Sequence, residues 1–178
     1  LVFDAPPTAD EIEASDAAQP VAQELRKVVA GARREILVES AYFILGDESL
    51  EQVARLRAAG VRLQALTNSL ASNDLVTNHS GYARRRPAML AAGMELFELR
   101  PDAAACQRIV AISRACDHGP AFSLHAKTMV LDRSVVYVGS FNFNLRSTYL
   151  NSETALIVES PELAGRVAAS MEELLRPD

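Results

Sequence analysis

The stretch SLHAKTMVLDRSVVYVGSFNFNLRSTYLNSE, residues 123–153, decides the fold that we expect for the whole chain. Two apolar, β-branched segments within it, MVL and VVYV, flank the turn sequence DRS, and this pattern predicts a β-hairpin. Side chains two residues apart lie on the same face of a strand, so His125 and Lys127 are expected to share one face. Asn142 follows the second strand, and the rest of the chain is expected to support this face.

The bulk composition indicates one globular domain. The chain has 178 residues, of which 49% are hydrophobic and 23% are charged. Residues 1–14, with paired prolines and several acids, are predicted to be an extended linker, and residues 15–178 the domain. The net charge of −5 does not provide the positive surface that binding to nucleic acid usually requires, so nucleic acid is not the favoured partner. A local basic patch would nevertheless suffice to bind it.

The chain carries no sign of a membrane span or a signal peptide, because no apolar run reaches about 18 residues. It begins with Leu1 rather than Met, so we expect a piece of a longer chain whose targeting signals or membrane anchors lie upstream. Cys106 and Cys116 lack the spacing of a zinc site. They are interpreted as free thiols, with a disulfide as the alternative.

Helical and strand patterns alternate along the chain, which is typical of an α/β domain with parallel strands. Apolar stripes predict helices over residues 20–30, 48–59, 88–92 and 161–175. Apolar runs predict strands over residues 35–44, 61–66, 94–99 and 153–159. Residues 101–120 show no period and are interpreted as a loop.

Polar residues follow the predicted strands at positions where α/β sites collect. Tyr42 and Asn68 lie at the carboxyl ends of two strands, and His79 lies in the loop that follows the second. These three residues are candidates to line a pocket, and ordinary structural roles are the alternative. The run Arg84-Arg85-Arg86 is interpreted as a solvated helix face, with contact to lipid headgroups or a membrane surface as the alternative.

The motif residues suit phosphoryl transfer without a metal or cofactor. The imidazole of His125 is a nucleophile or proton carrier near neutral pH, and the charge of Lys127 suits a phosphate oxygen. Ser140 and Asn142 offer hydrogen-bond donors to the same phosphate. Glu153 begins the next strand and could accept the second ring N–H of His125, which would set its tautomer.

These residues match the HxKx4Dx6GSxN signature of the phospholipase D superfamily, which the chain therefore resembles. The resemblance implies an α/β/α sandwich, with a mixed and mostly parallel sheet flanked by helices. It also implies that His125 is nucleophile or general acid and that Glu153 is the carboxylate behind it. Lys127, Ser140 and Asn142 would contact phosphate. Asp132 and Gly139 would be structural.

The resemblance extends beyond the motif to the second half of bacterial cardiolipin synthases that carry two such motifs. The runs TNSLASND, HSGYAR and ELFELRP are similar to that half, and the likeness covers roughly residues 1–177. Pro87, inside an expected helix, and the loop 101–120, with its two cysteines, depart from the pattern.

One His-x-Lys motif supplies only one side of a site, because transfer needs a nucleophile and a proton donor on opposite sides of phosphorus. The expected partner is a second motif-bearing half, either upstream in a longer chain or in a second copy. The leading hypothesis is the C-terminal half of a cardiolipin synthase that transfers a phosphatidyl group between phospholipids through a phosphohistidine. It would act peripherally at the cytoplasmic side of a bacterial inner membrane. The alternatives are a homodimeric phosphodiesterase or nuclease, and a non-catalytic phosphate-binding module.

Overall fold

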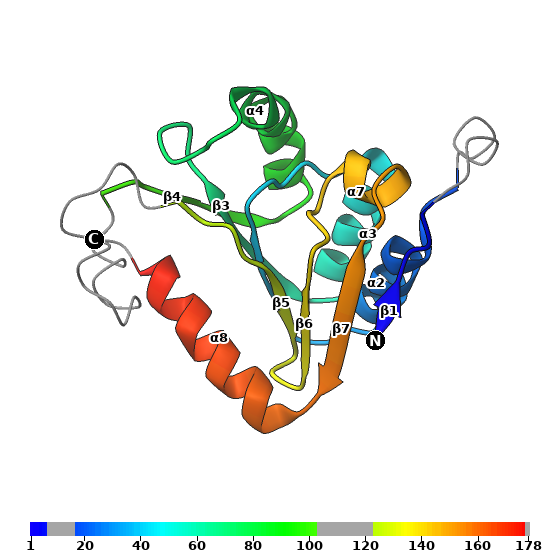
Figure 1. Ribbon diagram of the computed structural model, residues 1–178. Coiled ribbons are helices and arrows are strands. Elements are labelled where there is room, and N and C mark those ends of the chain that lie inside the picture. Colours follow the sequence, from blue (N-terminus) through cyan, green and yellow to red (C-terminus); the bar gives the residue numbers. More distant parts are fainter. Residues whose placement is uncertain (7–16, 103–122, 177–178) are drawn as a thin grey trace, which may run out of the picture.

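The computed structural model describes residues 1–6, 17–102 and 123–176, which form a seven-stranded sheet covered by helices (Figure 1). The strands lie in the order β1-β7-β6-β5-β2-β3-β4 across the sheet. They comprise β1 (Val2–Phe3), β2 (Glu35–Ser40), β3 (Arg62–Asn68), β4 (Glu95–Leu99), β5 (Lys127–Leu131), β6 (Val135–Gly139) and β7 (Thr154–Glu159). The helices are α2 (Pro20–Ala30), α3 (Asp47–Ala58), α4 (Val76–Ala91), α7 (Leu145–Tyr149) and α8 (Pro161–Leu175).

The sheet is mixed, as predicted, but parallel pairing is confined to one part of it. β2 is parallel to β3, and β3 is parallel to β4. The other described pairs, β2–β5, β5–β6, β6–β7 and β7–β1, are antiparallel. The expectation of a mostly parallel sheet is therefore wrong. Connection length explains this, because the short turn between β5 and β6 permits only antiparallel pairing, whereas α3 and α4 serve as the crossovers that parallel neighbours need.

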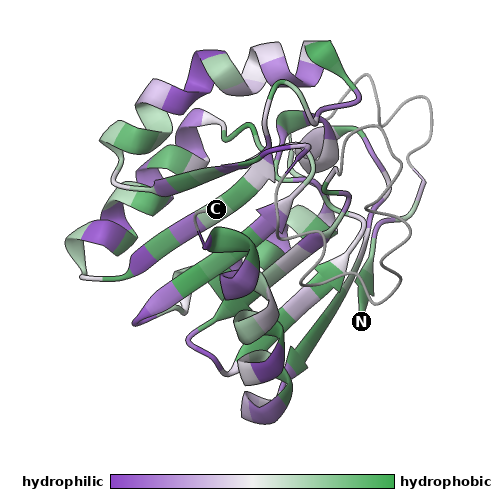
Figure 2. Cartoon of the chain, turned by 90° about the vertical axis from the view of Figure 1, so that its left-hand side faces the viewer, coloured by the Kyte–Doolittle hydropathy of each residue, from purple (hydrophilic) through white to green (hydrophobic). Residues whose placement is uncertain are grey.

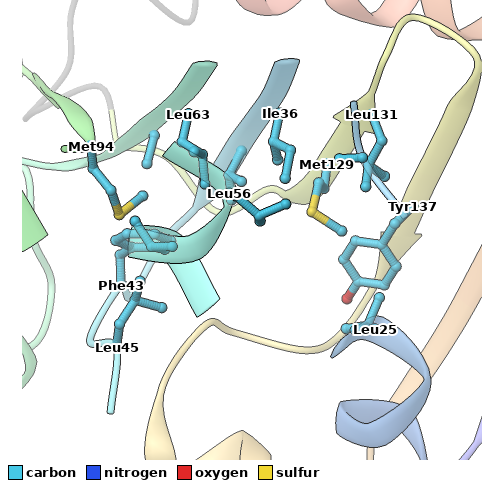
Figure 3. Packing of buried hydrophobic residues seen from close by; sticks show 14 of the residues in the cluster. Leu25, Ile36, Phe43, Leu45, Leu56, Leu63, Met94, Met129, Leu131 and Tyr137 are labelled. Atoms are coloured by element: carbon cyan, nitrogen blue, oxygen red, sulfur yellow. The ribbon is translucent and has the colours of Figure 1, made fainter. Parts of the chain in front are cut away.

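One face of the sheet packs against α2 and α3 and forms the main core. Alternate residues of the strands, such as Ile36, Leu63 and Met129, point to this face. Leu25 of α2 and Leu56 of α3 meet them from the other side. Figure 3 shows these side chains converging from the strands and the helices.

The opposite face is covered by α8. Its buried stripe of Ala164, Ala168 and Met171 packs against Leu37 and strand residues of β5 and β6. Two small alanines at i and i+4 let the helix lie close to the strands. In Figure 2, which views the molecule from this side, the strands are largely hydrophobic and α8 carries both kinds of residue.

The α4 helix is longer than the sequence pattern suggested. It runs from Val76 through Pro87 to Ala91. The apolar pattern predicted a helix over residues 88–92, and the helix implied around Pro87 and the three arginines had no predicted start. A proline inside a helix removes one backbone hydrogen bond, and Pro87 lies on an exposed position where this loss is tolerated. The departure at Pro87 therefore leaves the helix continuous.

Residues 1–14 were expected to form a linker, but the first of them belong to the sheet. Val2 and Phe3 pair with β7 as an edge strand. Asp4 is buried, and its carboxylate accepts hydrogen bonds from the backbone N–H groups of Val21 (2.8 Å) and Glu153 (3.0 Å). No local pattern marks this role, because the partners are far away in sequence. The described residues do not include the rest of the expected linker, residues 7–16. They also do not include most of the 101–120 loop, with Cys106 and Cys116.

No helix in the described part of the chain combines the length and apolarity that a membrane span requires.

The β5–β6 turn forms as predicted and is tied to the start of β2 by Asp132. Asp132 and Arg133 both have positive φ, 51° and 52°, the conformation of tight hairpin turns. The Asp132 carboxylate accepts hydrogen bonds from the backbone N–H groups of Arg33 (2.8 Å), Arg34 (2.7 Å) and Glu35 (3.0 Å). Burial acts to raise the pKa of Asp132, but these N–H groups and the charge of Arg34 hold it below its ordinary value.

We predict that Asp132→Asn lowers the free energy of unfolding by about 1–2 kcal/mol, because an amide replaces one acceptor oxygen while positive φ remains accessible. Urea unfolding at pH 7 measures the loss. A depressed pKa in the folded state gives stability that is present above the unfolded pKa of about 3.9 and fades as pH falls through the folded value. The difference between wild type and variant should therefore shrink below about pH 4.

The matched control is Ser134→Ala in the same turn, because the Ser134 hydroxyl makes only a 3.3 Å bond to the carbonyl of Leu131. We expect its unfolding to shift by less than about 0.5 kcal/mol. Equal midpoints for Asp132→Asn and wild type would contradict the role assigned to Asp132.

Candidate active site

The strand order brings the motif residues to one edge of the sheet. β2, β3 and β6 end at this edge, whereas β5 and β7 begin there because they run antiparallel to their neighbours. The edge therefore carries His125 and Lys127 at the start of β5, Gly139 at the end of β6, and Glu153 just before β7. Figure 1 shows α4 and α7 near this edge, with the β5–β6 turn at the other end.

Lys127 is fixed against the backbone of His125. Lys127 pairs with Ser40 of β2, and the pairing continues beyond β5 through the Ala41 N–H, which donates to the carbonyl of Ala126 at 3.2 Å. The Lys127 ammonium donates to the carbonyl of His125 at 2.8 Å. The His125 ring is exposed and makes no hydrogen bond within the described residues. It is therefore accessible to a substrate.

Two carboxylates act on the charge of the Lys127 ammonium, and within the described residues none forms an ion pair with it. Burial lowers the pKa of Lys127, and the charges of Glu153 and Asp74 oppose that shift. The ammonium is thus partly stripped of water next to the exposed histidine. A cation in such surroundings interacts more strongly with an incoming phosphate than a fully solvated one.

Asn68 holds the segment that carries the histidine. Its buried amide donates to the carbonyl of Leu124 (2.9 Å) and accepts from the Leu124 N–H (2.8 Å). It also donates to the carbonyl of Ala41 at 3.3 Å. The side chain therefore pairs with the residue before His125 as a strand would. Asn68 was predicted to line a pocket, but its polar atoms are committed to the backbone, and it positions the site instead.

Gly139 lies where the backbone of β7 leaves no room for a side chain. A Cβ at this position would be 2.2 Å from the carbonyl oxygen of Thr154 and 2.8 Å from the Tyr137 hydroxyl. Any other residue would push β6 away from β7. The glycine of the motif thus permits the close approach that brings Ser140 beside Glu153.

The Glu153 carboxylate contacts Ser140 and not the histidine ring. One of its oxygens accepts from the Ser140 hydroxyl, and the other accepts from the Asn151 amide at 3.0 Å. The Ser140 hydroxyl in turn accepts from the Thr154 N–H at 3.0 Å. The predicted hydrogen bond between Glu153 and His125 is therefore not formed. In this arrangement, the hydroxyl proton of Ser140 also faces Glu153 and not a phosphate.

Asn142 is the motif residue whose hydrogen-bonding capacity remains unfilled. Its side-chain oxygen is buried without a partner, and within the described residues its amide nitrogen makes no hydrogen bond. Phe141 and Phe143 flank it, with their rings packed into the core at centroids 5.6 Å apart. Ser40, whose hydroxyl accepts from the Phe143 N–H at 3.3 Å, anchors this loop to the end of β2. Nothing in the local sequence pattern marks Ser40.

Tyr42 lies beside the site and is paired with Asp74, which was not among the residues predicted from the sequence. The Tyr42 hydroxyl donates to the Asp74 carboxylate at 2.8 Å. Burial, together with this hydrogen bond and the charge of Asp74, raises the pKa of Tyr42 to about 12. Asp74 was missed because it lies in the loop before α4, without a recognisable spacing to the motif.

His79 lies in α4 and not in a loop, which corrects its predicted setting. It is buried, its ring packs against Tyr82 at a centroid distance of 5.7 Å, and its Nδ1 makes no hydrogen bond to the described residues. The hollow between α4 and the segment after β2 is lined by Thr77, Ser80 and Arg84, which lie on another part of the helix surface. His79 is therefore a packing residue of α4.

The three arginines of α4 have separate environments. Arg85 pairs with Asp47 and donates to the carbonyl of Leu45, and Arg86 pairs with Glu98. Arg84 is exposed and makes no ion pair within the described residues. Two of the three arginines are therefore bound to neighbouring elements, and only Arg84 fits the expected solvated face.

This edge of the sheet carries a half-buried cation, an amide and an exposed imidazole, and these are groups that suit the binding of an anion. In the described part of the chain, no three His, Cys, Asp or Glu side chains lie close enough to hold a metal ion. Glu39 is a further buried acid of β2, and burial raises its pKa to about 7. It lies one residue from Ser40 along the strand and so points to the opposite face.

Comparisons with known proteins agree with this geometry. Cardiolipin synthase C of Escherichia coli (strain K12) is 39% identical over 142 residues, which cover 80% of this chain and 30% of the relative. The phospholipase D family member Nuc from Salmonella typhimurium has a TM-score of 0.63 at 16% identity, covering 89% of this chain and 91% of Nuc. NucT from Helicobacter pylori has a TM-score of 0.61 at 14% identity, covering 94% and 91%.

The matches cover most of this chain but a smaller part of the curated relatives. The chain spans about 30% of the length of curated relatives such as Cardiolipin synthase C. The solved structures, at their low identity, establish the fold. The family model described as "Cardiolipin synthase, PLD-like domain" matches residues 25–175, which include every strand but β1. The chain therefore belongs to the cardiolipin synthase PLD-like family of the phospholipase D superfamily.

Proposed function

We propose that the chain is one catalytic half of a phospholipase D-type cardiolipin synthase, which transfers a phosphatidyl group from one phospholipid to an alcohol acceptor. The observation that carries this proposal is the edge of the sheet on which an exposed His125, a partly desolvated Lys127 and the unfilled amide of Asn142 come together. Membership of the family supports the choice of a phosphodiester as substrate.

In the proposed reaction, a ring nitrogen of His125 attacks phosphorus as the bond to the headgroup oxygen breaks. A general acid protonates the departing alkoxide. The acceptor alcohol then attacks the phosphohistidine, loses its proton to the same group, and releases the histidine. Lys127 and Asn142 bind the phosphate oxygens throughout, as charge spreads onto them. In the reverse assignment, His125 is the general acid and the nucleophile is elsewhere.

Glu153 takes a different proposed role from the one that the motif suggests. Its carboxylate is held by Ser140 and Asn151, and its charge acts on Lys127. We propose that Glu153 keeps the ammonium charged despite burial and holds the loop that carries Asn142. A substrate that reorients Ser140 would free one carboxylate oxygen for the histidine ring.

The second reactive group is proposed to come from another motif-bearing half. The chain carries one His-x-Lys motif and spans about 30% of Cardiolipin synthase C, which leaves room in such a relative for a homologous half. The proposed phospholipid substrates reside in a bilayer, so we place the enzyme at a membrane surface, peripherally on the cytoplasmic side of a bacterial inner membrane.

A homodimeric phosphodiesterase or nuclease is the second candidate. Nuc and NucT are each covered to 91% by this chain, so proteins of one-half length exist with this fold. The net charge of −5 disfavours a nucleic acid substrate. A non-catalytic phosphate-binding module remains the third, and the experiments below separate the three.

We predict that His125→Ala lowers turnover of a chromogenic phosphodiester at least 10³-fold in the assembled enzyme, because it removes the proposed nucleophile or acid. With phosphorus-labelled phospholipid, rapid alkaline quenching should trap label on this chain if His125 is the nucleophile. The matched control is His79→Gln in α4, which should retain activity within about threefold when its folding is verified. Full activity of His125→Ala would refute the role.

The assembly is tested by mixing. We expect the 178-residue chain to be inactive by itself and to gain activity when combined with the upstream half of a two-motif synthase. If the chain turns over the phosphodiester as a dimer and loses this activity on dilution, the homodimer is the correct assembly. If the chain binds phosphate but neither the chain nor its mixture with the upstream half turns over the phosphodiester, the chain is a binding module.

A further inference from the structure

A cavity of about 340 Å³ lies inside the molecule between the sheet, α2, α3 and α7. Its deep walls are apolar and buried, and they include Leu25, Val38, Phe43, Leu63 and Met129. Figure 3 shows most of these side chains pointing toward one another from the strands, from α2 and from the segment after β2. A cavity with such walls is disfavoured as a water site and favours apolar molecules.

The cavity opens at the edge of the sheet that carries the reactive residues. Among the described residues that line it, only Asp47, Glu48 and Leu145 are exposed. They lie in the first turns of α3 and α7, next to the loop that carries Asn142. Asp47 pairs with Arg85, and Glu48 pairs with Arg26, so the charges at the mouth are neutralised by partners.

The loop that follows β6 forms part of the cavity wall. Phe141 and Phe143 line the cavity, whereas Asn142 between them does not. The Ile44 N–H donates to the carbonyl of Phe143 at 2.7 Å, and this bond holds the loop along the cavity wall. One short loop therefore carries both Asn142 and two aromatic rings that line an apolar space.

The size of the cavity suits one alkyl chain. At about 30 Å³ for each water-sized group, 340 Å³ has room for on the order of ten heavy atoms in a row. Leu145, which is exposed at the mouth, also lines a second hollow that contains Arg84. An amphiphile with its chain in the cavity would thus have the Arg84 guanidinium, which makes no ion pair to the described residues, within the adjoining hollow.

We propose that this cavity binds about ten carbons at the methyl end of a lipid acyl chain and so aligns the phosphodiester with His125. The inference rests on the proposed function for the identity of the lipid, but the binding of the chain itself does not depend on catalysis. The site would select lipids by chain length, because carbons beyond the cavity gain no further burial.

The test measures the affinity of the 178-residue chain for linear alcohols from hexanol to tetradecanol by isothermal titration calorimetry, below their aggregation limits. We expect affinity to rise about fourfold with each added methylene up to about ten carbons and to level off beyond. His125→Ala should show the same series, which separates failure of the cavity from failure of the proposed catalysis.

Matched variants on α2 locate the binding. Val29→Phe places a larger ring in the cavity and should weaken decanol binding at least tenfold. Val28→Phe changes a neighbouring, half-buried valine that does not line the cavity, and should leave decanol affinity within twofold. If Val29→Phe does not fold, Ser49→Phe at α3 narrows the same cavity and should give the same loss.

Three results would overturn the proposal. These are no measurable binding of any alcohol, a rise in affinity that continues unbroken to tetradecanol, or equal affinity in wild type and a folded cavity-filling variant. The unbroken rise would indicate adsorption to an open apolar surface.

Discussion

The antiparallel insertion of β5 beside β2 is the constraint on which the rest of the structure depends. It places the amino end of β5 at the carboxyl ends of β2 and β3, so that His125 and Lys127 meet strands that end far earlier in the chain, at Ser40 and Asn68. Backbone pairing through Ala41 and Ala126 extends this contact, and the Asn68 amide closes it by pairing with Leu124. If this pairing slipped by one residue, the motif side chains would move to the other face.

A second group of contacts fixes the other wall of the site. The missing side chain of Gly139 lets β7 approach β6, and Ser140 then reaches Glu153. Asp4, from the opposite end of the chain, binds the backbone of Glu153 and of α2. The carboxylate of the site is thus located by polar contacts from three elements, and this suits a group whose charge supports Lys127 against desolvation.

Much of the fold and part of the site could be predicted from sequence. The helices at residues 20–30 and 161–175 and the turn at Asp132 follow local rules, namely apolar periodicity and turn chemistry. The start of α4 at Val76 was missed because residues 76–87 lack a clear apolar stripe and contain Pro87. The pairing of β1 could not be read, because two residues carry no periodicity.

The sequence by itself determined the class of the protein and the residue types of the candidate site, because the spacing of the motif from His125 to Asn142 is a property of the sequence and does not depend on the fold. Only the tertiary structure decided what those residues touch. The Ser140 hydroxyl donates to Glu153, and His79 lies in a helix. Asn68, a candidate for a pocket, instead binds the backbone of Leu124. These outcomes depend on contacts between residues far apart in the chain, and no local pattern encodes the distance between two strands.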